Sequence, residues 1–308
     1  MRPPRAKKRA AKAARAASTA KPAPPAGSTR PPTTFQATYS AYGLAFEVSS
    51  PSDEIARGVD FIYREMRADP APTSAPRIEI RPKSPGSSEL SVAFAGEPWF
   101  EAVRIGDLLH QLDNQLTVAL EHGRPDLYFV HSAALELDGQ ATLLVGDSGA
   151  GKSTTCYALC ASSVGYLSDE LAAIEPETGR VLPYPRAICL KRDPPAPLRL
   201  PDSSFRTEWT LHTQASDLGS RIARDGALLS RILFVRWSAS HAKPLLRPIS
   251  RGEAALRLYQ GALNQLAHPA FGLDDTLRLI ERSECFELLS AGIEETVALV
   301  RGASHATR

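Results

Sequence analysis

The most informative segment of the chain is Leu143-Leu144-Val145-Gly146-Asp147-Ser148-Gly149-Ala150-Gly151-Lys152-Ser153-Thr154. It fits the pattern G-x-x-x-x-G-K-[ST], the Walker A motif or P-loop of nucleotide-binding proteins. An apolar run typical of a strand, 141–145, precedes the motif, and a helix-like run, 153–161, follows it. Phosphate binding by such a loop requires this order of strand, loop and helix. The stretch therefore predicts an α/β fold with a nucleoside triphosphate site.

The glycines and the lysine of this motif have different roles in binding phosphate. Gly146, Gly149 and Gly151 let successive N–H groups face one point, and the following helix adds its positive N-terminal end. Lys152 reaches the β- and γ-phosphates, and the Ser153 hydroxyl joins the ligands of Mg²⁺. The residues predicted to bind ATP here are Gly146, Asp147, Ser148, Gly149, Ala150, Gly151, Lys152, Ser153 and Thr154. The alternative is a glycine-rich turn with an incidental lysine, which the flanking strand and helix disfavour.

An acid pair, Asp169-Glu170, follows about sixteen residues beyond Ser153. An acid at a strand edge near a P-loop can hold Mg²⁺ or accept a hydroxyl proton as phosphoryl transfer begins. Asp169 is the candidate base, and Glu170 is a metal partner or an orienting group. Together with Ser153, the two acids are the candidate ligands of Mg²⁺. The alternative is a solvated turn, because most carboxylates are exposed.

His131 lies in the strand-like run just upstream of the P-loop strand, within Phe129-Val130-His131-Ser132-Ala133. Taken alone, a histidine among apolar neighbours is more often a core residue with satisfied hydrogen bonds than a functional group.

The arrangement of these segments resembles the HPr kinase/phosphorylase family and its HPr-kinase-related relatives. The matching segments, in order, are His131-Ser132-Ala133-Ala134-Leu135, the P-loop at 146–154 and Leu167-Ser168-Asp169-Glu170. The stretch Val181-Leu182-Pro183-Tyr184-Pro185-Arg186-Ala187-Ile188-Cys189-Leu190-Lys191 is similar to a proline-arginine-to-lysine stretch of the related kinases. The resemblance covers residues 128–192 and extends more loosely to about 300.

The resemblance implies a fold shared with phosphoenolpyruvate carboxykinases and transfer of phosphate from ATP to a serine of a small protein. It implies that His131 lies in the active site, beside the base Asp169 and its neighbour Glu170. It also implies that Arg186 and Lys191 are cations near the phosphates. For these two, an ordinary solvated charge is the alternative.

The chain differs from the HPr kinases in its acid pair, which is Asp-Glu where those enzymes have Asp-Asp, and it has no counterpart of their later Glu- and Gly-rich signature. Relatives of this kind often accompany peptide-modification systems, so the expected acceptor is a Ser or Thr hydroxyl of a peptide or small protein. Two other functions remain open: a regulatory or assembly module that binds ATP without transfer, and an ATPase whose acceptor is water.

Charge is distributed unevenly along the chain. Nine of the 36 basic residues and no acidic residue fall in the first thirty positions, which leaves 27 basic against 34 acidic residues in the rest. An acidic body argues against a folded nucleic-acid platform, because such surfaces need clustered Lys and Arg. No apolar run is long enough for a membrane span, and the N-terminus lacks the apolar segment of a secretory signal. These features predict a cytoplasmic protein with free thiols, and the sequence allows an oligomer.

Composition divides the chain into four parts. Residues 1–34 read as a disordered basic arm, because Ala, Pro, Lys and Arg cannot bury enough apolar surface to fold. Residues 35–125 read as a small α/β region with helices at 52–66 and 98–122, and we expect no chemistry there. Residues 126–302 form the kinase-like domain, in which 193–230 read as loops or a flexible lid. Residues 303–308 are a tail.

Overall fold

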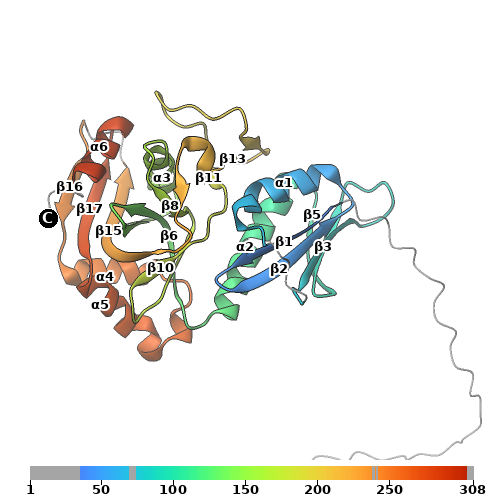
Figure 1. Cartoon of the computed structure of the whole chain (residues 1–308), viewed down its shortest axis with the longest axis horizontal. Coiled ribbons are helices and arrows are strands. Elements are labelled where there is room, and N and C mark those ends of the chain that lie inside the picture. The colour runs from blue at the N-terminus through green and yellow to red at the C-terminus, as the bar shows by residue number, and fades with distance from the viewer. Residues whose placement is uncertain (1–34, 69–73, 238–239, 241, 304–308) are drawn as a thin grey trace, which may run out of the picture. The chain divides into compact units, whose positions relative to one another are not determined.

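The computed structural model describes residues 35–68, 74–237, 240 and 242–303, and these belong to one compact unit (Figure 1). It is a mixed α/β structure with three β-sheets, which agrees with the predicted fold class at that level. The predicted basic arm, 1–34, lies outside the described residues. So does the predicted tail, except for Ala303, the last residue of helix α6.

The first sheet is built by residues 35–102 and is covered by two helices. Its strands lie in the order β1-β2-β3-β4-β5. The strands are β1 (Phe35–Ala41), β2 (Leu44–Ser50), β3 (Arg77–Pro82), β4 (Leu90–Phe94) and β5 (Glu97–Ala102). The two α-helices are α1 (Asp53–Tyr63), which is followed by the short 3₁₀ helix η1 (Arg64–Met66), and α2 (Ile105–Gly123). Ser52 caps α1 by accepting a hydrogen bond from the Ile55 N–H group, as its position before the apolar stripe predicts.

The predicted helix at 98–122 begins too early. Residues 97–102 form β5, which pairs with β4, and α2 begins only at Ile105. Trp99 stacks on Phe94 of the neighbouring strand with the ring centroids 4.9 Å apart. Aromatic residues gain more from cross-strand packing than from a helix, and Val103, which falls inside the predicted helix, is exposed.

The second sheet has nine strands and carries the P-loop segment. Its order is β14-β8-β6-β9-β10-β15-β17-β16, and β7 pairs with β6 and β15. The strands are β6 (Tyr128–Leu137), β7 (Gln140–Val145), β8 (Gly165–Ser168), β9 (Leu171–Ile174), β10 (Arg180–Leu182), β14 (Arg221–Ile222), β15 (Ala227–Trp237), β16 (Leu245–Pro248) and β17 (Glu284–Ser290). The pairing β15–β7–β6–β9–β10–β15 closes a ring of hydrogen-bonded strands.

Helices cover both faces of this sheet (Figure 1). The helices are α3 (Lys152–Cys160), α4 (Arg251–Gln260), α5 (Leu273–Glu281) and α6 (Ile293–Ala303), with short 3₁₀ turns η2 (Ser216–Leu218), η3 (Gln265–Ala267) and η4 (Pro269–Gly272). In β7, Leu143 belongs to the core cluster with α4 and α5, whereas Leu144 belongs to the cluster with α3 and α6. Successive strand residues point to opposite faces, so helices on both faces explain why 141–145 are all buried and, except for Thr142, apolar.

Strands β8 and β9 both pair antiparallel with β6, and the ladder is interrupted between them. Ala134 pairs with Ser168 and His131 pairs with Leu171, so the residues between them, Asp169 and Glu170, lie at the break. A break in a ladder lets side chains leave the alternating pattern of a strand. The acid pair therefore lies beside the middle of β6, close to the end of the β6–β7 ladder, where Ser132 pairs with Val145, the last residue before the glycine-rich loop.

The predicted loop region, 193–230, contains short strands. β12 (Phe205–Arg206) and β13 (Leu211–Thr213) form a third sheet with β11 (Ile188–Leu190), in the order β11-β13-β12, and β14 adds to the large sheet. The strands of two or three residues within 193–230 were not predicted, because the region has a low apolar content. Within the ranges that the structure describes, no helix is both long and apolar enough to cross a bilayer.

Two residues of helix α2, one buried and one exposed, test the packing of the first core, the hydrophobic cluster between the first sheet and its helices. Leu116 is buried in the cluster between the first sheet and its helices, while Val118 on the same helix is 46% exposed. Removing a buried leucine side chain costs its transfer free energy and leaves a cavity, so Leu116→Ala is expected to lower the free energy of unfolding by about 2 to 5 kcal/mol. Val118→Ala, the control, should change it by less than about 1 kcal/mol. Urea titration followed by circular dichroism measures both, and equal effects would contradict this packing.

Candidate functional site

The glycine-rich loop, defined as residues 146–151, connects the end of β7 to the start of α3. Gly149 and Gly151 have φ values of 85° and 98°, a conformation that side chains other than glycine rarely adopt. A Cβ atom on Gly146 would lie 2.7 Å from the carbonyl oxygen of Val235 in the neighbouring strand β15. The loop therefore needs glycine for its curvature and for the close approach of β15.

Lys152 begins α3, and its side chain folds back over the loop. Its Nζ donates to the carbonyl oxygens of Gly146 at 2.6 Å and Asp147 at 3.2 Å. The residue is buried, and burial lowers the pKa of its ammonium group. Lys191, just after β11, donates from Nζ to the Ser148 hydroxyl at 3.0 Å. Two ammonium groups thus lie against one loop, in a position where an anion would be attracted.

The acid pair is shaped by Ser168. The Ser168 hydroxyl accepts hydrogen bonds from the N–H groups of Glu170 and Leu171, at 3.3 and 3.1 Å. A serine that bonds to the backbone two and three residues ahead stabilises a turn. This turn buries the side chain of Asp169, which is 1% exposed as a residue, and leaves Glu170 partly exposed. Sequence reasoning did not identify Ser168 as a contributor.

The two carboxylates have opposite surroundings. Asp169 Oδ2 accepts a hydrogen bond from the Cys189 N–H group at 2.8 Å, while Oδ1 has no hydrogen-bond partner among the described residues. Burial raises the pKa of Asp169 to about 6, although the positive charge of Arg186 opposes the rise. For Glu170, burial also favours the neutral form, but the hydrogen bond from His131 and the charge of Arg186 outweigh it and lower the pKa to about 2. Neighbouring acids with separated pKa values can take separate roles in proton transfer.

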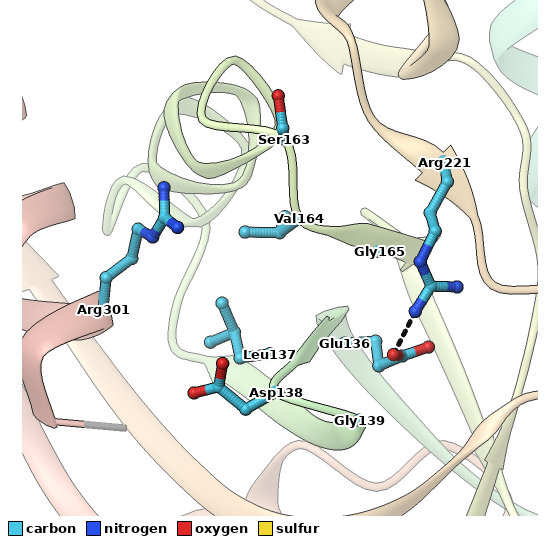
Figure 2. A pocket seen from close by; sticks show the side chains of 9 residues that line it. All are labelled: Glu136, Leu137, Asp138, Gly139, Ser163, Val164, Gly165, Arg221 and Arg301. Carbon is cyan, nitrogen blue, oxygen red and sulfur yellow. Dashed lines mark hydrogen bonds and ion pairs between the residues drawn. The ribbon is translucent and has the colours of Figure 1, made fainter. Parts of the chain in front are cut away.

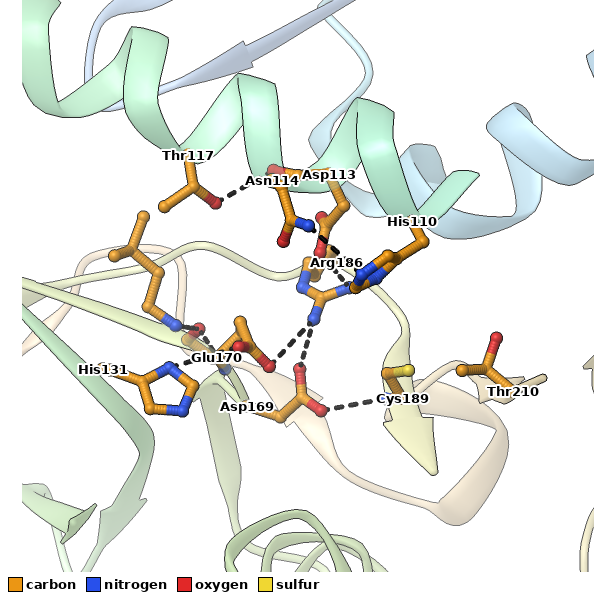
Figure 3. Close-up of polar contacts among 12 residues, drawn as sticks. His110, Asp113, Asn114, Thr117, His131, Asp169, Glu170, Arg186, Cys189 and Thr210 are labelled. Atoms are coloured by element: carbon orange, nitrogen blue, oxygen red, sulfur yellow. Dashed lines mark hydrogen bonds and ion pairs between the residues drawn. The ribbon is translucent and has the colours of Figure 1, made fainter. Parts of the chain in front are cut away.

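Arg186 links the acid pair to the rest of the fold (Figure 3). Its side chain is 3% exposed, and its Nη2 lies 3.6 Å from Asp169 Oδ1 and 3.4 Å from Glu170 Oε2. The Tyr166 hydroxyl donates to the Arg186 carbonyl oxygen at 2.9 Å and fixes the backbone there. The alternative of an ordinary solvated charge is therefore wrong for Arg186.

His131 faces the same cluster from β6. Its Nδ1 lies 3.2 Å from Glu170 Oε1, and its side chain is 36% exposed. The structure thus brings His131, Asp169, Glu170 and Arg186 together, and it brings Lys191 to the glycine-rich loop beside Lys152. A histidine enclosed in the apolar core, the alternative that the sequence left open, does not fit this exposure.

One residue of the cluster was missed at the sequence level. Asp113 of α2 places Oδ2 at 3.1 Å from Nη1 of Arg186, and its side chain is 15% exposed. We expected no chemistry in residues 35–125. The available signal was the position of Asp113 four residues after Leu109 and three before Leu116, where the helical pattern calls for an apolar residue. A carboxylate at such a position needs a partner.

The predicted ligands of Mg²⁺ are Ser153, Asp169 and Glu170. In the part of the chain that the structure describes, no group of three or more His, Cys, Asp or Glu side chains is arranged to hold a metal ion. Mg²⁺ at a phosphate site keeps several waters and takes one or two carboxylates with phosphate oxygens, so it does not need such a group. The partly exposed Glu170 carboxylate and the Ser153 hydroxyl on the first turn of α3 are oxygen donors of the right kind. The Asp169 carboxylate is directed at Arg186 and the Cys189 amide instead.

A surface pocket of about 210 Å³ lies elsewhere (Figure 2). It is lined by the turn between β6 and β7, by residues 163–165 and by Arg221 and Arg301. Arg221 forms an ion pair with Glu136 at its edge. The turn precedes β7 and the glycine-rich loop follows it, so this pocket lies at the opposite end of the strand and includes none of the predicted site residues.

Comparisons with known proteins give a structural neighbour but no family. No protein-family model matches the chain, and no curated protein matches it. Among solved structures, the chain is similar to the Hpr(Ser) kinase/phosphatase from Coxiella burnetii, with a TM-score of 0.30 and 11% sequence identity over 57% of this chain and 95% of that chain. A TM-score of this size does not establish a shared fold.

The raised pKa of Asp169 predicts a pH-dependent effect on stability. A carboxyl whose pKa is about 6 in the folded protein and 3.8 by default binds its proton more tightly when folded, so stability falls as pH rises from about 4 to about 6. Asp169→Asn removes this penalty, and it is expected to raise the free energy of unfolding by up to about 3 kcal/mol at about pH 8, with little change at about pH 4.

Urea titration at both pH values measures the effect, and Asp202→Asn, at an exposed position, is the control. A variant that is equally stabilised or destabilised at both pH values would show that the Asp169 carboxylate is not held in this environment.

Proposed function

We propose that this protein is an ATP-dependent kinase resembling the HPr kinases, which transfers the γ-phosphate to a Ser or Thr hydroxyl of a peptide or small protein. The observation that carries the proposal is the glycine-rich loop between β7 and α3, with Lys152 folded over it and Lys191 beside it. Main-chain N–H groups, a helix N-terminus and two ammonium groups at one place match a triphosphate chain in charge and in hydrogen-bonding capacity.

Catalysis in such a site rests on positioning and on charge stabilisation. Lys152 neutralises the β- and γ-phosphates, and Lys191 and Arg186 add positive charge near them. Asp169 accepts the proton of the acceptor hydroxyl at Oδ1, the oxygen without a hydrogen bond. A pKa of about 6 leaves this carboxyl mostly ionised at neutral pH and still basic enough to take a proton.

Glu170 and His131 complete the site beside the base. Glu170 stays ionised because its pKa is low, and the hydrogen bond between the two residues orients both side chains. When Mg²⁺ is bound, held by Ser153 and Glu170 with Asp169 nearby, it neutralises charge on the phosphate oxygens. The order of His131, the P-loop and the acid pair in the chain supports an HPr-kinase type of core, preceded by a small α/β region at 35–125.

The experiment measures binding and transfer separately. Calorimetry with Mg²⁺ and ATP gives the affinity, and γ-labelled ATP with HPr and a library of Ser and Thr peptides gives transfer. Lys152→Ala is expected to weaken ATP binding by about 10- to 100-fold, because it removes a charge-assisted contact with phosphate. Lys243→Ala, at an exposed position outside the site, is the control.

Replacing each acid by the corresponding amide distinguishes the roles of Asp169 and Glu170. Asp169→Asn is expected to lower transfer by about 100- to 10,000-fold and to leave ATP affinity within about threefold, because a base acts only in the chemical step. Glu170→Gln should weaken the dependence on Mg²⁺ as well. Transfer at the wild-type rate in Asp169→Asn would remove Asp169 from the role of base.

Other results would assign another function. Release of γ-phosphate to water with every acceptor tested would make the protein an ATPase, and saturable ATP binding with neither release nor transfer would make it a binding module. The absence of binding to both ATP and GTP in the presence of Mg²⁺ would contradict the proposal as a whole.

A further inference from the structure

The helix α2 belongs to the N-terminal region, yet part of its surface contacts the acid pair through Arg186. Four polar residues at helical spacing, His110, Asp113, Asn114 and Thr117, lie on the side of α2 next to Arg186 (Figure 3). Asn114 Nδ2 lies 3.3 Å from His110 Nε2, and the Thr117 hydroxyl donates to the Asp113 carbonyl oxygen at 3.0 Å. Leu109, Leu112 and Leu116 lie on the adjoining side of the helix and belong to the hydrophobic cluster under the first sheet.

The contacts of Arg186 divide between its two terminal nitrogens. Nη1 forms the shortest of its ion pairs, at 3.1 Å, with Asp113, whereas Nη2 faces Asp169 and Glu170. The planar guanidinium group has a fixed fork geometry, so a partner that holds one nitrogen also sets the direction of the other. Asp113 thus determines which way Nη2 points.

Asp113 is itself held in place. The Tyr63 hydroxyl, from the end of α1, donates to Asp113 Oδ1 at 3.3 Å, and the Tyr63 ring is fully buried. The Asp113 side chain is only 15% exposed. A carboxylate fixed by a helix, a buried hydroxyl and an ion pair has few conformations available, which is what a group needs in order to orient another.

Three carboxylates around one guanidinium are more than charge balance requires. A single partner would neutralise Arg186, and Asp169 and Glu170 are already adjacent to it from one turn. The third carboxylate is that of Asp113 on α2, about seventy residues before Arg186 in the chain. It competes with Asp169 for the guanidinium group, and so it keeps Arg186 from pairing fully with the candidate base.

We propose that Asp113 is a positioning residue of the phosphotransfer site, which holds Arg186 in the orientation that catalysis needs and makes the N-terminal region part of the active site. This inference rests on the proposed kinase function. Asp113 acts through Arg186 and does not touch the phosphate or the acceptor.

The first test measures the accessibility of Arg186 and does not depend on activity. Phenylglyoxal modifies accessible arginines, and peptide mass spectrometry gives the rate at each site. Arg186 is 2% exposed in the folded protein and is expected to react slowly, while the exposed Arg192 reacts quickly. Asp113→Asn should increase the rate at Arg186 at least about fivefold and leave Arg192 unchanged, because an arginine that loses its best partner moves more.

The second test reads catalysis. Asp113→Asn is expected to lower kcat for γ-phosphate transfer to the peptide library by about 10- to 100-fold, with the KM for ATP within about threefold, because misplacement by about 1 Å has effects of this size. Asp113→Glu keeps the charge and should recover part of kcat. Asp107→Asn is the matched control on the same helix, where Asp107 accepts from Trp209 Nε1 at 3.2 Å and does not contact Arg186.

The outcomes separate this inference from the function on which it rests. A wild-type protein that binds ATP and transfers phosphate to nothing would remove the kinase function and this role with it. An active wild type, with unchanged protection of Arg186 or an unchanged kcat in Asp113→Asn, would overturn the positioning role alone. Equal losses of kcat in Asp113→Asn and Asp107→Asn would show a general effect of α2 on folding and would also overturn it.

Discussion

The site depends on one buried charge, the guanidinium group of Arg186. An isolated charge of this kind would cost several kcal/mol to remove from water, so it has to be matched by carboxylates. Asp113 supplies one from α2, and Asp169 and Glu170 supply two from the break between β8 and β9. The ion pairs of Arg186 therefore connect helix α2 of the N-terminal region to the turn between β8 and β9 of the large sheet.

The break between β8 and β9 gives the two acids their different surroundings. A continuous strand would place neighbouring side chains on opposite faces of the sheet. Ser168 accepts hydrogen bonds from two N–H groups at the break and holds a turn, which buries Asp169 and leaves Glu170 near solvent beside His131. The separation of the pKa values of the two acids follows from this geometry, because burial dominates at Asp169 while hydrogen bonding and charge dominate at Glu170.

Regular structure with a strong local pattern could be predicted from the sequence. The runs 128–137 and 171–174, which are mostly apolar and buried, are strands. The predicted helix at 98–122 started seven residues early, because the segment with Trp99 and Phe100 pairs with the neighbouring strand β4 and does not form a helix. The helix α6 and the strand β16 were not predicted, and their stability comes from packing against β17 and α3.

The glycine-rich loop between a strand and a helix could be recognised from the residues alone, because its glycines, lysine and flanking runs act over a few residues. The same holds for the candidate residues His131, Asp169, Glu170, Arg186 and Lys191, partly through a family resemblance. Packing between distant segments brings four of these residues together and places Lys191 on the loop. The position of Asp113 among the apolar residues of α2 signals a carboxylate that needs a partner. Its partner Arg186 is decided by the tertiary structure alone, because the two residues meet only when α2 packs beside the break in the sheet.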